Sequence, residues 1–299
     1  MNKIEKEPSH TYTSVAESVF QVERSAWNNC ANFIDDNRNI GNPFLSHEFF
    51  SCLEESGSVS KETGWISQHI LLFEEGNSLI GILPNYLKNH SWGEYIFDQV
   101  FANAWENAGG KYYPKLLSAI PFSPVAGERF LIKKGYSRKF VIEKLLDALE
   151  DLKKFYKVSS AHINFINEPQ LKIALKNKFW FERNNIQFHW SNQNYENFEH
   201  FLSKLSSSKR KTIRRERKEI HKSSVLIDIV KNDEIKNYHS KIFYNFYLST
   251  IEKKWGGVYL NQKFWDLLIQ YLKNRIVFIF SKQDGEFIGG AINLIDQST

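Results

Sequence analysis

The chain has 299 residues, with 39 basic and 34 acidic side chains and a formal net charge of +5. Its length suits two domains of ordinary size, and the 15% of aromatic residues supplies a substantial core, which argues against disorder. Two cysteines, Cys30 and Cys52, form neither a disulfide framework nor a metal motif, and the absence of a signal peptide or an 18-residue apolar stretch predicts a cytoplasmic protein.

Residues 1–12 are predicted to form a polar arm, and residues 13–191 a first domain. Ser46 is an N-cap residue ahead of Phe49, Phe50 and Leu53, which have helical spacing. The predicted elements that open this domain, in chain order, are a strand over 15–22, a helix over 25–33, a break at 41–43, the helix that Ser46 caps and Gly57 closes, a strand over 66–73, a turn over 74–77 and a strand over 78–87.

Residues 88–136 are rich in aromatic residues, Gly and Pro, and long irregular stretches inside folded domains are often functional. An amphipathic helix follows, with Phe140, Ile142, Leu145, Leu146 and Leu149 on one side. The last predicted elements of the first domain are a strand over 161–166, a helix over 168–178 and a strand that ends at 187–190.

A hairpin signature occurs twice in the chain, over Gly76–Leu87 and over Asp284–Ile295. When the two copies are aligned, Ile80 matches Ile288, Gly81 matches Gly289 and Asn85 matches Asn293. The second copy ends a predicted domain over 192–299, which contains a long helix over 195–222, a strand over 224–230, helices over 234–251 and 262–272, and the hairpin.

This second series repeats the first five elements of the first series in the same order, which indicates a duplicated unit. The sequence therefore predicts an α/β (α+β) fold with two tandem mixed-sheet domains, the second truncated after its β-hairpin.

Six unusual motifs follow one another along residues 42–299. They are 42–49 (NPFLSHEF), 90–95 (HSWGEY), 112–116 (YYPKL), 121–125 (PFSPV), 187–190 (QFHW) and 208–214 (SKRKTIR). With the repeated element order, they resemble the FemAB-like predicted N-acyltransferases, which are related to the Fem-type peptidoglycan aminoacyl ligases and have the GNAT fold. The resemblance implies two tandem GNAT-like domains, of which the second is incomplete here, so that the chain is expected to be either a fragment of a longer gene product or a protein that is naturally cut short.

The same resemblance implies an N-acyltransferase that moves an acyl or aminoacyl group from an activated donor to an amine, and the acceptor it suggests is a peptidoglycan or cell-envelope precursor. The implied donor is acyl-CoA or aminoacyl-tRNA, with an anionic small-molecule substrate and tRNA as possible partners and no metal. A GNAT unit holds the donor pyrophosphate on a Gly-rich loop that opens a helix. The corresponding segment, Lys133–Arg138, lacks that signature. The alternative is therefore a non-catalytic or inactive module that binds an anionic ligand, either nucleotide-linked or RNA.

The strongest local charge lies over Lys209–Lys218, which holds seven basic side chains and one acidic one. On a helix, Arg210, Arg214 and Arg217 share a face, which together with Lys209 predicts a phosphate-binding surface. The alternative is an ordinary solvated helix face.

Further candidate residues come from the aromatic stretch and from the motif before the basic helix. Glu94 or Asp98 is a candidate general base for an attacking amine, and surface loop charges are the alternative. His189 and Trp190 are expected either to line a cleft between the domains, with His189 in catalysis, or to pack at a strand end. Three further residues are predicted to form a substrate pocket, with the last of them reaching an anionic group: Tyr112, Tyr113 and Arg129. The histidines show no metal-ligand spacing, so we expect no metal.

Overall fold

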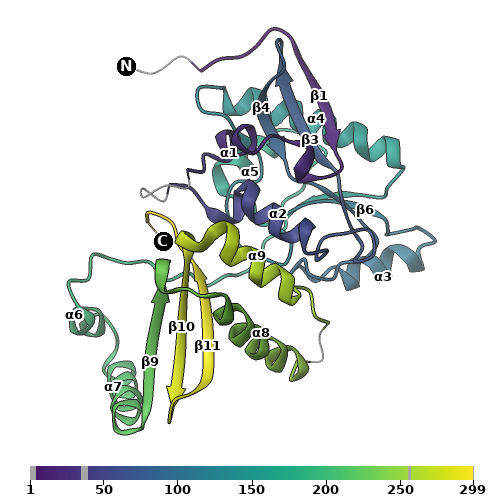
Figure 1. Ribbon diagram of the computed structural model, residues 1–299. Helices are drawn as coiled ribbons and strands as arrows, with labels where there is room; N and C mark the ends of the chain where they lie inside the picture. Colours follow the sequence, from purple (N-terminus) through teal and green to yellow (C-terminus); the bar gives the residue numbers. More distant parts are fainter. Residues whose placement is uncertain (1–4, 35–39, 255–256, 299) are drawn as a thin grey trace.

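The computed structural model describes residues 5–34, 40–254 and 257–298 and confirms the mixed α/β fold. Figure 1 shows two bodies, an upper one whose last helix covers Glu168–Ala174 and a lower one whose first helix covers Phe198–Ser203, with helix α9 (Gln262–Leu272) where they meet. The polar arm is attached to the first body, because the backbone N–H of Lys6 donates to the carbonyl of Gly135 at 2.8 Å.

The first body has helices on both faces of its strands. Its elements are β1 (Thr11–Ala16), α1 (Arg24–Ala31), α2 (His47–Glu55), β2 (Trp65–Ser67), β3 (His69–Glu74), β4 (Ser78–Leu83), β5 (Tyr86–Lys88), α3 (Gln99–Asn107), β6 (Lys115–Ser118), β7 (Leu131–Ile132), α4 (Arg138–Tyr156), β8 (Ala161–Ile163) and α5 (Glu168–Ala174), with short 3-10 turns at Val19–Gln21 and Pro43–Leu45.

The hairpin predicted over 66–87 is bent, so that each of its two predicted strands is divided between two sheets. The first predicted strand forms β2 and β3, and the second forms β4 and β5. One four-stranded sheet has the order β1-β3-β4-β7, and the other has the order β2-β5-β6-β8. The bend lies at Gln68 and Asn85, where the N–H of Gln68 donates to the carbonyl of Asn85 at 2.8 Å. Only β6 and β8 pair in parallel, among the strands the structure describes.

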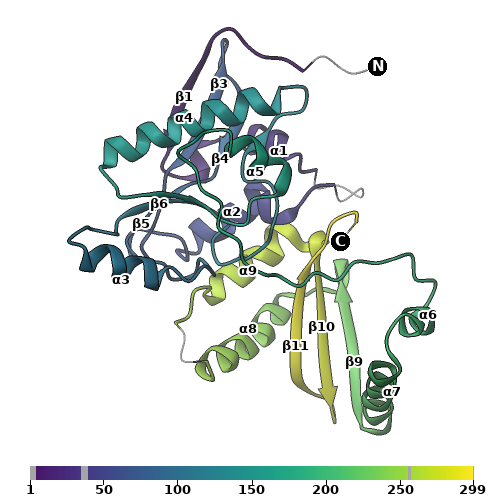
Figure 2. The ribbon, with the colours of Figure 1, turned by 180° about the vertical axis from the view of Figure 1, so that it is seen from behind.

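Helix α4 lies across the sheet that contains β3 and β4 (Figure 2). Ser137 caps it by accepting a hydrogen bond from the N–H of Phe140, and its apolar side buries Val141, Leu145 and Leu149. The structure thus confirms the helix that the apolar spacing predicts. The buried side chains of α4 make up much of the apolar cluster of the first body.

The second body is a three-stranded antiparallel sheet with the order β11-β10-β9, covered on one face. Its elements are α6 (Phe198–Ser203), α7 (Ser207–Lys222), β9 (Val225–Lys231), α8 (Asn237–Glu252), α9, β10 (Ile276–Gln283) and β11 (Glu286–Leu294), with 3-10 turns at Asn232–Glu234 and Lys273–Arg275. Phe278 and Phe280 point to the covered face and are buried, with Phe243 of α8 5.9 Å from the ring of Phe278. The opposite face leaves Ile227 and Ile229 exposed.

The two hairpins share a detail that the repeat in the sequence implies. In β3–β4 the pairing passes from Leu72↔Gly81 to Phe73↔Leu79, so Ile80 is the extra residue of a bulge. In β10–β11 it passes from Ser281↔Gly289 to Lys282↔Phe287, so the extra residue is Ile288. Ile80 and Ile288 are aligned in the sequence repeat, which supports a duplicated unit. The incompleteness of the second domain stays a prediction.

The aligned glycines Gly81 and Gly289 provide a matched test of what covers each sheet. A methyl group at Gly81 would lie 2.5 Å from Cγ1 of Val141 in α4, whereas one at Gly289 would meet only the Oγ atom of Ser281, at 2.8 Å. We expect Gly81→Ala to lower the free energy of unfolding by about 1–3 kcal/mol through overpacking. Gly289→Ala should change it by less than about 0.5 kcal/mol, because the Ser281 side chain can rotate away. Denaturant titration measures both, and equal losses would contradict this account of the two faces.

The two bodies are joined by helix α9, whose predicted bounds are confirmed and which packs against α2. The rings of Phe49 and Phe264 meet at 5.9 Å, and the side chain of Asn261 donates to the carbonyl of Ser56 at 2.7 Å. Beside this contact, Phe122 stacks on Tyr259 at 5.2 Å. Buried side chains of both bodies belong to one apolar cluster, so the interface is packed like a protein interior.

Three predicted elements are wrong. The strand expected over 15–22 is β1, over Thr11–Ala16, followed by a 3-10 turn. The strand expected to end at 187–190 is absent, because residues 179–196 of the described chain pair with no strand. The single helix expected over 195–222 is two helices, since Asn197 caps α6 and Ser206 caps α7.

Candidate functional site

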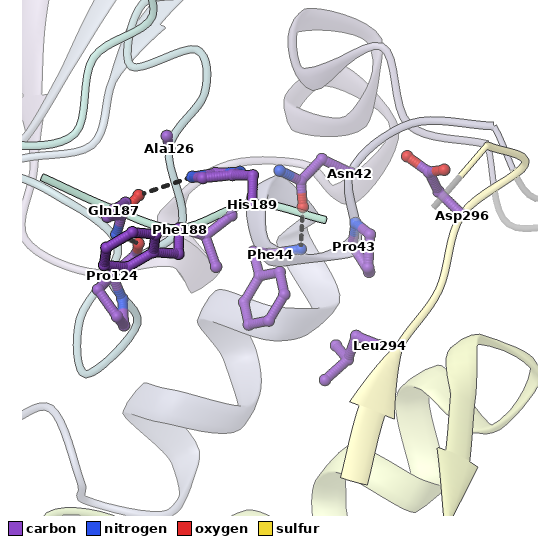
Figure 3. Close-up of a pocket in the computed structure, with 11 residues that line it drawn as sticks. Asn42, Pro43, Phe44, Pro124, Ala126, Gln187, Phe188, His189, Leu294 and Asp296 are labelled. Carbon is purple, nitrogen blue, oxygen red and sulfur yellow. Dashed lines mark hydrogen bonds between the residues drawn. The ribbon is translucent and has the colours of Figure 1, made fainter. Parts of the chain in front are cut away.

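A cavity of about 490 Å³ lies where the two bodies meet (Figure 3). Four separate segments of the chain supply its walls, and ligand sites often form at such junctions between domains. The residues that line it are Asn42, Pro43, Phe44, Pro124, Val125, Ala126, Gln187, Phe188, His189, Leu294 and Asp296. Three of the motifs that run along the sequence, 42–49, 121–125 and 187–190, thus meet at one place.

The first wall is fixed by capping interactions. The side-chain carbonyl of Asn42 accepts a hydrogen bond from the N–H of Phe44 at 3.0 Å, which closes the turn around Pro43. Ser46 then donates to the carbonyl of Pro43 at 2.7 Å and caps α2. The Asn-Pro-Phe segment therefore presents its side chains from a rigid helix entry.

The second wall, over residues 121–126, is braced from behind by Arg129. This side chain is 1% exposed, and its guanidinium donates to the carbonyls of Val125 and Asn164. Burial lowers the pKa of Arg129 to about 9. Its donors are committed to backbone carbonyls, so the structure gives Arg129 a positioning role and does not place it on the cavity surface, where an anionic group was expected.

The third wall is the extended segment that links the bodies. Gln187 donates through Nε2 to the carbonyl of Pro124, and its Oε1 lies 3.1 Å from Nε2 of His189 (Figure 3). His189 therefore lies at the cavity between the bodies, as one of the two sequence interpretations has it. Trp190, which was expected beside it, is exposed and is not among the lining residues.

The charge of the lining indicates which ligand it suits. Asp296 supplies a carboxylate, His189 an imidazole, and Asn42 and Gln187 supply amides, while the described lining contains no Lys or Arg. Asp296 accepts hydrogen bonds from the N–H and the hydroxyl of Ser298 at 2.6 and 3.0 Å, which orient its carboxylate. Such a lining suits an ammonium group, also through the aromatic faces of Phe44 and Phe188, and its described residues offer a phosphate no Lys or Arg side chain.

Glu94 and Asp98, the two predicted bases, meet in a different place. The ammonium group of Lys115 donates to Glu94 at 2.7 Å, to Asp98 at 2.6 Å and to the hydroxyl of Ser91 at 2.9 Å. All three charged side chains are at most 1% exposed, and the more exposed Arg183 adds a second cation at 2.6 Å from Asp98. We call these four residues, Glu94, Asp98, Lys115 and Arg183, the ionic cluster.

Burial raises the pKa of Glu94, although Lys115 acts in the opposite direction, and the second carboxylate oxygen of Glu94 has no hydrogen-bond partner among the described residues. For Asp98, burial alone would raise the pKa, but Lys115 and Arg183 outweigh it and the pKa is lowered. Lys88, which lies 3.7 Å from the ring centre of Trp65, has its pKa lowered by burial to about 7. The two carboxylates therefore differ in protonation behaviour because their cationic neighbours differ.

The ionic cluster lies behind the second wall of the cavity. The carbonyl of Gly93, next to Glu94, accepts a hydrogen bond from the N–H of Phe122 at 3.2 Å, and a methyl group at Gly93 would lie 2.5 Å from the Phe122 ring. The wall residues Pro124 and Val125 follow Phe122 after one intervening residue, Ser123. Glu94 thus supports the segment that lines the cavity and does not reach the cavity itself.

Tyr112 and Tyr113 lie beside the ionic cluster and are not among the residues that line the cavity. The hydroxyl of Tyr113 lies 2.8 Å from that of Ser91, and the ammonium of Lys115 is 5.6 and 5.9 Å from the two tyrosine ring centres. Burial raises the pKa of Tyr112. The motifs 90–95 and 112–116 therefore meet around Lys115, a residue within a recognised motif that the sequence interpretation did not single out.

Helix α7 carries the basic run and none of its residues is buried. The face with Arg210, Arg214 and Arg217 turns toward α6. Arg210 donates to the carbonyl of Leu205 at 2.6 Å, Arg214 pairs with Glu199 at 2.5 Å, and Arg217 lies 4.2 Å from the ring centre of Phe198. The remaining bases, Lys209, Lys211, Arg215 and Lys218, are exposed.

The structure therefore places His189 at the cavity, while Glu94, Asp98, Tyr112 and Tyr113, predicted as base candidates and as pocket walls, meet around Lys115 away from it. Sequence reasoning did not identify Asn42, Gln187 or Asp296 as lining residues. The first two lie in motifs that the resemblance had already marked, whereas Asp296 stands in no motif and only the contact between the bodies brings it to the cavity.

Comparison with known proteins adds the following. The family model named FemAB-like, described as peptidoglycan biosynthesis/recognition, matches residues 18–299. No curated protein sequence matches the chain. Among solved structures, FemX is similar with a TM-score of 0.46 and 13% identity over 88% of this chain. The chain spans 57% of the length of FemX. Aminoglycoside 6'-N-acetyltransferase AAC(6')-Ih from Acinetobacter baumannii has a TM-score of 0.34 and 12% identity, over 61% of this chain and 99% of its own.

Proposed function

Because the chain belongs to the FemAB-like family of peptidoglycan biosynthesis and recognition, we propose that it is an N-acyltransferase that transfers an acyl or aminoacyl group to an amine of a cell-envelope peptide. The observation that carries the proposal is the cavity between the bodies, whose described lining combines a carboxylate, an imidazole and two amides and contains no Lys or Arg. Acceptor amines are protonated near neutral pH, and this lining suits their charge.

In the proposed reaction Asp296 and the aromatic walls hold the acceptor as an ammonium group. His189 then takes one proton, which frees the nitrogen lone pair to attack the acyl carbon. The carbon–nitrogen bond forms and the bond to the donor's leaving group breaks. That group departs with the electron pair and takes up the second proton of the nitrogen, which leaves a neutral amide. No covalent intermediate on the protein is required, because positioning of the two substrates supplies much of the rate.

We assign Glu94, Asp98, Tyr112 and Tyr113 a supporting role. Through Lys115 they fix the loop at Gly93, which holds the second wall by the Phe122 hydrogen bond. Trp190, next to His189 in the chain, has an exposed ring that is available to a substrate extending out of the cavity.

The donor is proposed to be anionic, either acyl-CoA or aminoacyl-tRNA, and to contact helix α7. The exposed bases Lys209, Lys211, Arg215 and Lys218 are available to phosphate groups. Arg210, Arg214 and Arg217 already contact α6, so their proposed contribution is to hold α7 in place and to add to the local positive potential.

The test uses a short stem peptide with one free side-chain amine, offered with acetyl-CoA or with aminoacyl-tRNA, and mass spectrometry of the peptide. We expect a mass increase on the free amine and none on a peptide whose amine is acetylated. Asp296→Asn should weaken peptide binding by about tenfold to a hundredfold, because a charge-assisted hydrogen bond contributes about 1.5–3 kcal/mol. The control Asp151→Asn, an exposed carboxylate on α4, should bind normally.

The second candidate function, a non-catalytic module for an anionic ligand, is favoured by the exposed basic helix alone. It would show as RNA binding that weakens steeply with salt, with no transfer from either donor and no effect of Asp296→Asn. Such a result would contradict the acyltransferase proposal.

A further inference from the structure

Helix α3 carries its apolar side chains on the outside. Among its residues only Ala102 is buried. Along one stripe, Phe97 is 82% exposed, Val100 77%, Phe101 56% and Trp105 52%. Val100, Phe101 and Trp105 have the spacing of one side of the helix, and Phe97 lies directly before its N-cap residue, Asp98.

The segment that leads into α3 adds two exposed aromatic side chains, Trp92 and Tyr95. We call the six residues Trp92, Tyr95, Phe97, Val100, Phe101 and Trp105 the aromatic stripe. A group of this size is unusual on a soluble surface and marks an interaction site, whereas single exposed apolar residues need no explanation. Its composition is two Trp, two Phe, one Tyr and one Val.

The inner side of α3 is firmly attached, which makes the stripe a rigid surface. Asp98 at the start of the helix is held by Lys115 and by Arg183, and Arg183 also donates to the carbonyl of Phe97 at 2.9 Å. The helix therefore cannot turn its apolar side inward without breaking the ionic cluster, so this side stays available to a partner outside the body.

The charges around the stripe indicate what covers it. Arg183 lies 4.7 Å from the ring centre of Phe101 and is 46% exposed, so part of its guanidinium faces the same side. Lys111 follows Gly110, on which Trp105 packs, and is exposed at the other end. The stripe itself contains no acidic residue, and the acid of the helix, Glu106, is not part of it. Basic side chains beside Trp and Phe are the combination that binds the headgroup region of a bilayer.

We propose that the aromatic stripe docks on a membrane surface that contains anionic lipids, with α3 lying parallel to the bilayer. Trp and Tyr rings favour the interface between water and acyl chains. A helix of nine residues is too short to cross a bilayer. No helix in the part of the chain that the structure describes is long and apolar enough to do so.

The test is co-sedimentation of the purified chain with phosphatidylcholine vesicles, with and without phosphatidylglycerol. We expect binding that is stronger with the anionic lipid and that the double variant Phe97→Gln/Val100→Gln weakens by about tenfold or more, since both side chains lose their apolar area to insert. No other contact is broken, so folding should be unchanged by circular dichroism. The matched control Phe155→Gln, an aromatic residue 75% exposed on α4, should bind like the original chain.

Absence of binding to both vesicles would overturn the proposal. So would equal binding by the double variant, which would place the lipid contact on the basic helix α7. A change of oligomeric state in the double variant, without a change in lipid binding, would assign the stripe to a second copy of the chain instead. Transfer to a water-soluble amine peptide does not depend on the stripe, so the acyltransferase proposal is tested separately.

Discussion

Replacing Lys115 with Met is expected to lower the free energy of unfolding by about 3–5 kcal/mol. The ammonium group is the shared partner of Glu94 and Asp98, and all three side chains are at most 1% exposed. Removing one member of a buried ionic group leaves the opposite charges buried without a partner. The resulting loss of folding free energy is larger than the stabilisation that the intact group provides. Glu94 would lose the donor at 2.7 Å, while Asp98 would keep Arg183. Denaturant titration followed by tryptophan fluorescence measures the loss.

The control for this prediction neutralises the carboxylates together with the lysine. The triple variant Lys115→Met/Glu94→Gln/Asp98→Asn removes the stranded charges and should recover much of the lost stability. A second control, Lys154→Met, breaks the exposed pair with Asp151, in which both side chains are more than 70% exposed, and should cost less than about 1 kcal/mol. If Lys115→Met and Lys154→Met cost the same, the ionic cluster does not stabilise the first body.

Replacing Arg275 with Met is expected to lower the free energy of unfolding by about 2–4 kcal/mol and to weaken peptide binding at the cavity at least tenfold. Arg275 is fully buried between the bodies. Its guanidinium donates to the carbonyls of Ile34 and Ile40 at 2.7 and 3.0 Å and lies 4.5 Å from the ring centre of Phe33. Each buried carbonyl that loses its hydrogen-bond donor lowers the free energy of unfolding by about 1–3 kcal/mol.

The effect on binding follows from what lies beside these contacts. Arg275 also reaches the carbonyls of Gly41 and Ile295 at 3.5 Å, and its own carbonyl accepts from the N–H of Ile295 at 2.8 Å. Gly41 precedes Asn42, and Ile295 precedes Asp296, so one side chain holds two opposite walls of the cavity. Calorimetric titration with the stem peptide measures the change in affinity.

Lys273→Met is the matched control, because Lys273 is two residues away and pairs only with the exposed Asp233 among the described contacts. It should leave both stability and binding nearly unchanged. A loss of stability in Arg275→Met with normal peptide binding would show that the cavity walls do not depend on this residue.

Features that depend on local chemistry could be predicted from the sequence. Helix α9 has its predicted bounds because Asn261 caps it and its apolar residues keep a helical period. The hairpin repeat was visible because a bulge and a turn need particular residues at fixed positions, and Ile80 and Ile288 occupy equivalent bulges. The break between α6 and α7 could also have been predicted from the sequence, because Asn197 and Ser206 are both residue types that favour the N-cap position.

Features that depend on partners distant in the chain could not be predicted in this way. The apolar residues around Phe188 suggest a strand, but a strand needs a neighbour to pair with, and this segment has none among the described residues. Likewise, the sequence marks Glu94 and Asp98 as acidic residues without showing that Lys115 would neutralise them.

The sequence by itself thus determined the mixed α/β class, the duplicated hairpin and the membership of the motifs in one family, because each depends on residue types at short spacing. Only the tertiary structure decided that three motifs share a cavity with Asp296 while two others enclose a buried lysine. The physical reason is that burial and charge pairing arise between segments far apart in the chain, so the role of an acidic or basic side chain is set by what the fold places beside it.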